Sequence, residues 1–82
     1  MLAYPNPARD RVSFLVDPTA SGPVEINIFN LAGERVAVLR AETAAENHGV
    51  LTWSAGDVAP GVYLVRVSVG GSTHDLKVAV VK

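Results

Sequence analysis

The sequence predicts an all-β fold, an antiparallel sandwich of about six to seven strands. Apolar residues recur at every second position in six separate runs, and turn-forming residues bound each run. Many of the apolar residues are β-branched, which favours strands over helices. Short strands at this close spacing with turns between them imply a sandwich or a barrel. The predicted strands span residues 11–16, 23–29, 34–40, 49–54, 61–69 and 72–81.

Within each run, the alternation assigns residues to a shared face. The residues that share a face, strand by strand, are Val12, Phe14 and Val16; Val24, Ile26 and Ile28; Val36 and Val38; Leu51 and Trp53; Tyr63, Val65, Val67 and Val69; and Leu76, Val78 and Val80. Phe14, Trp53 and Tyr63 are each in phase with aliphatic neighbours, so we expect them in the core, whereas Phe29 has the opposite phase.

The connections have the chemistry of turns. Gly33 ends a short turn that begins at Asn30, and Gly70-Gly71 is a two-residue hairpin signal. Residues 40–48 have helix propensity but are too short for a stable helix, so we expect a long loop with one helical turn. Pro5 and Pro7 favour an extended conformation, so we interpret residues 1–7 as the end of a linker and 8–82 as the domain.

The composition bounds the function. The 82 residues suit one domain with no disulfide, because there is no cysteine. A net charge of −1 argues against a nucleic-acid partner, and no apolar run approaches the length of a membrane span. No signal peptide follows Met1, which we read as a start codon added to an excised fragment of an exported parent protein.

No pattern of side chains predicts catalysis, a metal or a cofactor. His48 and His74 lie near different connections, and metal sites usually need three or four converging ligands. The aspartates lack the spacing of a calcium loop, although Asp57 with a neighbouring loop carbonyl is a remaining alternative. No serine lies at a strained strand-to-helix turn, so we expect no enzyme activity.

The last two predicted strands are apolar on both faces. Val62 and Leu64 lie opposite in phase to Tyr63, and Val81 is out of phase with the buried positions of its own strand. A strand of a small sandwich normally exposes one face, so such a strand is either covered by loops or offers an apolar patch or an edge to a partner.

These residues resemble a known family. The blocks that carry the resemblance, in order, are Tyr4-Pro5-Asn6-Pro7, residues 30–36, Trp53, residues 60–67 and residues 76–82. Together they resemble the C-terminal sorting domain of type IX secretion substrates, over nearly the whole chain. By resemblance, Gly61 and Tyr63 match the glycine-containing strand motif of that family, while Lys77 and Lys82 match its basic C-terminal motif.

The resemblance implies an immunoglobulin-like sorting domain of an exported Bacteroidota-type protein. It implies recognition by the outer-membrane secretion translocon, cleavage in the preceding linker by a surface sortase, and joining of the upstream parent domains to lipopolysaccharide at the cell surface. The Ig-like domain of flagellar hook-capping proteins shares the Trp and the Gly-x-Tyr strand, but its intervening loop is usually longer than the one between Trp53 and Gly61. The alternatives are a carbohydrate- or cell-wall-binding module of a polysaccharide-degrading enzyme and a purely structural spacer.

Overall fold

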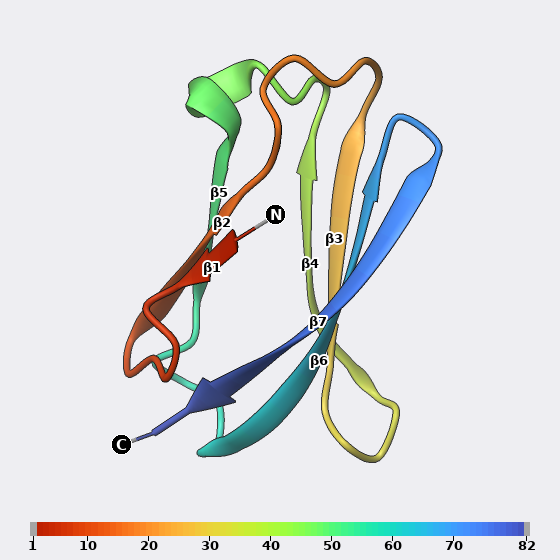
Figure 1. The fold of residues 1–82 in the computed structure, drawn as a ribbon. Helices are drawn as coiled ribbons and strands as arrows, with labels where there is room; N and C mark the ends of the chain where they lie inside the picture. Colours follow the sequence, from red (N-terminus) through yellow and green to blue (C-terminus); the bar gives the residue numbers. More distant parts are fainter. Residues whose placement is uncertain (1, 82) are drawn as a thin grey trace.

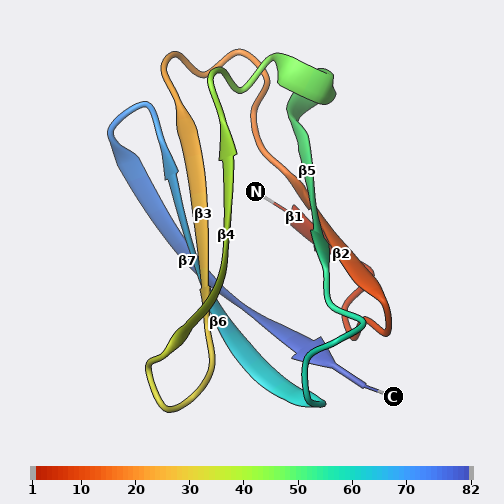
Figure 2. The ribbon, with the colours of Figure 1, turned by 180° about the vertical axis from the view of Figure 1, so that it is seen from behind.

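A computed structural model describes residues 2–81. Within that range seven strands form two antiparallel sheets that pack face to face (Figures 1 and 2). The strands are β1 (Leu2–Tyr4), β2 (Arg11–Leu15), β3 (Val24–Phe29), β4 (Arg35–Ala41), β5 (Val50–Ser54), β6 (Gly61–Val69) and β7 (Ser72–Val80). The strand orders are β1-β2-β5 and β4-β3-β6-β7. The predicted all-β sandwich is confirmed, with the strand pairing of an immunoglobulin-like domain.

The core lies between the sheets and is built by alternation. In β3 and β6 every second residue is buried, and the residues between them face outward. The predicted burial of Phe14, Trp53 and Tyr63 is confirmed. Because fully burying an aliphatic or aromatic side chain contributes about 1.5–3 kcal/mol, this continuous apolar layer supplies the main stabilisation of a domain without disulfides.

The fourth strand differs from the predicted pattern. A bulge between Ile28 and Phe29 shifts the register, so that Ile28 pairs with Ala37 but Phe29 pairs with Arg35. Val36 therefore has no partner of its own and is 39% exposed. Alanine and leucine side chains on the other phase of β4 pack against the core instead.

The first strand lies in the segment that we interpret from the sequence as the end of a linker. Leu2–Tyr4 pairs with β2, with Ala3 opposite Phe14, and Ala8 is fully buried. These residues are thus packed onto the sandwich. Where an upstream linker begins stays a prediction.

The connection between β4 and β5 is a loop with a short 3-10 turn, η1, at Glu46–Gly49. The carboxylate of Glu46 accepts hydrogen bonds from the backbone N–H groups of Glu42 and Thr43, at 2.6 and 3.4 Å. Ala44 is fully buried, so this loop closes one end of the core.

Both predicted hairpin turns are confirmed. The Asn30 side-chain oxygen accepts from the backbone N–H groups of Ala32 and Glu34, each at 3.0 Å, which fixes the turn between β3 and β4. Gly70 and Gly71 both have positive φ, 55° and 88°, as a type I′ turn requires. A Cβ atom on Gly70 would collide with the carbonyl oxygen of Ser21, whereas one on Gly71 would meet nothing within 4 Å.

This difference makes the two glycines a matched pair for mutation. Gly71→Ala should cost about 1–2 kcal/mol of unfolding free energy, because an L side chain disfavours positive φ. Gly70→Ala should cost about 1–3 kcal/mol more, because it adds a steric clash with backbone. Urea denaturation of both variants measures the difference, and equal losses would contradict the packing of Gly70 against the Ser21 carbonyl.

Candidate functional site

The β6–β7 hairpin brings three of the four predicted sorting residues together. Its register places Gly61 opposite Val80, Tyr63 opposite Val78, and Leu64 opposite Lys77. The fourth predicted residue, Lys82, lies outside the described residues. The end of the chain therefore runs beside the start of β6, where the glycine-containing motif lies.

An apolar patch covers the outer face of this hairpin. Val62 and Leu64 are 40% and 37% exposed, although both are large aliphatic residues in a nine-residue strand. Val62 pairs with Ala79, and Val81 at the end of β7 is 38% exposed. We call Val62, Leu64, Lys77, Ala79 and Val81 the hairpin patch. Loops therefore leave Val62, Leu64 and Val81 partly open to solvent, and a partner that covers them stays a prediction.

A groove of about 380 Å³ adjoins the hairpin patch on the side of β3. Phe29, Leu64 and Lys77 line it, together with the ion pair of Arg66 and Asp75. The Arg66 guanidinium donates to both Asp75 carboxylate oxygens, at 2.9 and 3.3 Å, and these bonds lower the pKa of Asp75. Within residues 2–81 the Lys77 ammonium has no acidic partner. The groove thus offers apolar surface beside an ion pair and the Lys77 ammonium, which suits binding.

Tyr63 lies under the patch. It is 6% exposed, and its ring meets the Trp53 ring edge-on, with centroids 5.5 Å apart. Its hydroxyl donates to the carbonyl oxygen of Ala59, at 2.5 Å. A tyrosine at the start of this strand, bonded to the backbone just upstream, is the tyrosine corner of immunoglobulin-like domains.

Gly61 begins β6 inside this corner, between Ala59 and Tyr63. Its φ of 153° is rare for L side chains, and no atom lies within 4 Å of where a Cβ would be. Gly61 and Tyr63 thus have an evident structural role in starting the strand. Their role in recognition stays a prediction.

The aromatic rings do not form a sugar-binding platform. Trp53 is 4% exposed, and Phe14 is fully buried. Phe29 is half-buried beside the groove, and Tyr4 is 42% exposed on β1. The flat, exposed stacking surface that a carbohydrate module needs is not built from Phe14, Trp53 and Tyr63.

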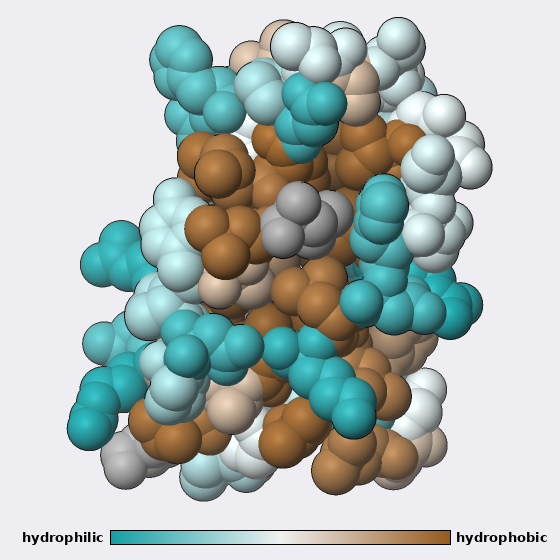
Figure 3. All heavy atoms as spheres, in the orientation of Figure 1, coloured by the Kyte–Doolittle hydropathy of each residue, from teal (hydrophilic) through white to brown (hydrophobic). Residues whose placement is uncertain are grey.

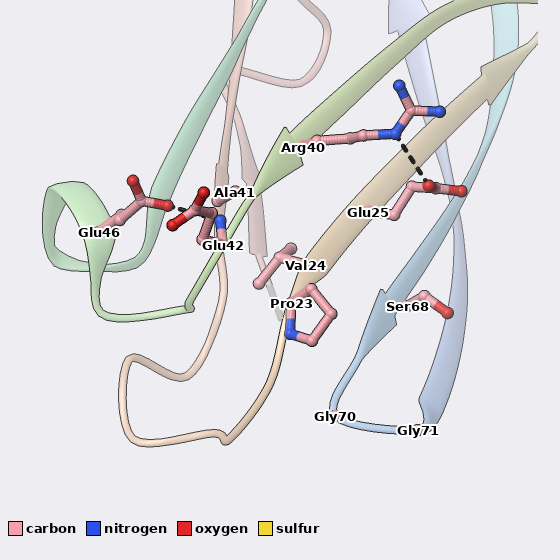
Figure 4. A pocket seen from close by; sticks show the side chains of 10 residues that line it. All are labelled: Pro23, Val24, Glu25, Arg40, Ala41, Glu42, Glu46, Ser68, Gly70 and Gly71. Carbon is pink, nitrogen blue, oxygen red and sulfur yellow. Dashed lines mark hydrogen bonds and ion pairs between the residues drawn. The ribbon is translucent and has the colours of Figure 1, made fainter.

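A larger hollow lies at the other end of the hairpin, near Gly70 and Gly71 (Figure 4). It has a volume of about 630 Å³. Two of its charged groups form an ion pair: Glu25 accepts from Arg40 at 3.0 Å, and hydrogen bonds from Asn27 and Arg40 lower the pKa of Glu25. It contains none of the predicted sorting residues.

Metal-binding side chains are dispersed. Among residues 2–81, no three histidine, cysteine or acidic side chains gather in a way that could hold an ion. Asp57, the remaining calcium alternative from the sequence, is exposed on the loop between β5 and β6. No helix in the described range is long and apolar enough to cross a membrane.

One residue with a clear place in the site was missed by sequence reasoning. Asn6 bonds to the backbone of β7, although more than 70 positions separate them. The available signal was an asparagine held between two prolines.

Figure 3 shows hydrophobic side chains gathered in a band down the face that carries β1 and β7, with hydrophilic side chains on both sides.

Comparison with known proteins gives one family. The model of the secretion system C-terminal sorting domain matches residues 2–82. No curated protein matches. The relation to the Ig-like domain of hook-capping proteins stays a prediction.

The tyrosine corner gives a test of what fixes the start of β6. Tyr63→Phe should lower the unfolding free energy by about 1–2 kcal/mol, because the Ala59 carbonyl loses its donor. Tyr4→Phe is the matched control, since Tyr4 is 42% exposed, and it should change stability by less than about 0.5 kcal/mol. Denaturant unfolding measures both, and equal effects would refute the role of the hydroxyl.

Proposed function

Because this chain belongs to the family of secretion system C-terminal sorting domains, we propose that it is a non-catalytic module that attaches a larger exported protein to the cell surface. Membership in this family identifies the chain as a C-terminal sorting signal for type IX secretion. Such a signal directs export to the cell surface or the extracellular space. The proposal adds the partners and the attachment.

The observation that carries the proposal is the exposed hairpin patch. Val62, Leu64 and Val81 keep more than a third of their surface in solvent, on the hairpin that carries three of the predicted sorting residues. Lys77 stands among them and makes no ion pair within residues 2–81. An apolar surface with a single cation suits a protein partner, which is here the outer-membrane translocon.

The later steps follow from the family resemblance. A surface sortase cleaves the linker upstream of the domain and joins the parent protein to lipopolysaccharide. The fold supports access for such an enzyme, because β1 is an edge strand and Leu2 is 54% exposed. A linker that enters at this strand is open to solvent.

The carbohydrate-binding alternative has no specific observation in its favour. Its best candidate rings, Trp53 and Tyr63, pack against each other in the core. We keep it as an outcome of binding tests with soluble and insoluble polysaccharides.

The decisive experiment is export of a reporter. Fusion of the chain to the C-terminus of a periplasmic reporter should send the reporter to the surface of a host with a type IX apparatus. Deletion of residues 77–82 should abolish export, because it removes Lys77 and the end of the hairpin patch. Cell fractionation and surface protease accessibility measure the result. Periplasmic retention of an intact, folded fusion would contradict the proposal.

A matched pair of substitutions tests the patch itself. Val62→Thr keeps β-branching but makes the patch polar, and it should reduce export several-fold. Val36→Thr makes the same change at an equally exposed position, 39% against 40%, on the opposite edge strand of the same sheet, and export should be unchanged. Equal export by the two variants would refute the patch as the recognition surface.

A further inference from the structure

We infer that Asn6 is a positioning residue. Its side chain takes the place of one pair of backbone hydrogen bonds, a rung, in the hydrogen-bond ladder that holds the C-terminal end of β7. β7 is the edge strand of its sheet, so one side of its backbone has no strand partner. Residues 5–8, which we call the strap, lie along that side (Figures 1 and 2). The strap follows β1 and joins the edges of the two sheets.

The Ala8 backbone makes one rung of this ladder. Its N–H donates to the Ala79 carbonyl and its carbonyl accepts from the Val81 N–H, both at 2.8 Å. This is the pattern of a parallel bridge, in which one residue bonds to the two residues that flank its partner. The partner here is Val80.

The Asn6 carboxamide repeats the same pattern two residues earlier on both segments. Its Nδ2 donates to the Lys77 carbonyl at 3.3 Å, and its Oδ1 accepts from the Ala79 N–H at 3.0 Å. The flanked residue is now Val78. Asn6 and Ala8 thus form one continuous parallel ladder along β7, in which the first rung is made by a side chain.

The chemistry explains why asparagine stands at this position. A backbone rung at this position would use the N–H and carbonyl of residue 6 itself, as Ala8 does, and the prolines on either side have no N–H that could take its place. A carboxamide carries a donor and an acceptor, as a peptide group does. Aspartate would keep only the acceptor, and alanine would keep neither.

The bonded residues are also those that display the hairpin patch. Lys77, Ala79 and Val81 give their backbone groups to the strap and their side chains to the outer face. Asn6 therefore fixes the backbone from which the patch projects. The link from this rung to export rests on the proposed function.

Amide hydrogen exchange followed by NMR tests the rung without any export. In Asn6→Ala the Ala79 amide should lose protection by about tenfold, the effect of losing one hydrogen bond. In the isosteric Asn6→Asp the acceptor remains, so the Ala79 amide should stay protected. Protected amides of β3, such as that of Ile26, should be unchanged in both variants and report that the fold is intact. Unaltered Ala79 protection in a folded Asn6→Ala protein would overturn the inference.

The reporter fusion then tests the consequence. Export should fall in the order wild type, Asn6→Asp, Asn6→Ala, with a several-fold loss in the last. Lost Ala79 protection with undiminished export would overturn the positioning role. If the wild-type fusion is not exported, the proposed function fails, while the exchange data still decide whether Asn6 forms the rung.

Discussion

The register of β6 is the constraint on which the other elements depend. This strand pairs with β3 on one side and β7 on the other, and its alternate residues from Tyr63 to Val69 face the core. A slip of one residue would turn that whole row outward. Two contacts fix the register at its ends: the Tyr63 hydroxyl on the Ala59 carbonyl, and the close packing of Gly70 on Ser21. The outward placement of Leu64 and Lys77 follows from the same register.

Most of the sandwich could be predicted from the sequence, because six strands carry their own period-two signal and the glycine turns between them are recognisable. The strand Leu2–Tyr4 could not, because three residues are too few for a pattern and its pairing is supplied by β2. Nor could the inner face of β4, because pairing with β3 sets it: Leu39 lies opposite the buried Ile26, which leaves Val36 on the outer phase. The placement of Gly61, Tyr63 and Lys77 in one hairpin was predictable from the Gly70-Gly71 turn. The bonds of Asn6 join the two ends of the chain, and no local pattern encodes them.

The predicted sorting residues, which the sequence motifs group together, have two different environments in the structure. Tyr63 is inside the sandwich, where it stabilises the start of β6, whereas Lys77 is outside, beside the exposed aliphatic residues. Loss of Tyr63 would therefore lower the stability of the fold, whereas loss of Lys77 would change the exposed surface. The glycine-containing strand motif can therefore belong to the scaffold of a sorting domain, while the surface that we propose for recognition is built on the opposite phase of the same two strands.

The strap has a mechanical consequence. It runs parallel to β7, and its hydrogen bonds cross from one segment to the other. A pull that draws the upstream side of the strap and the C-terminal end of β7 in opposite directions would slide one past the other. The Asn6 and Ala8 bonds would then bear the load together, in shear, whereas a peeling force would break them one after another. The hydrogen bonds between the strap and β7 are therefore oriented to resist tension between the two ends of this small domain.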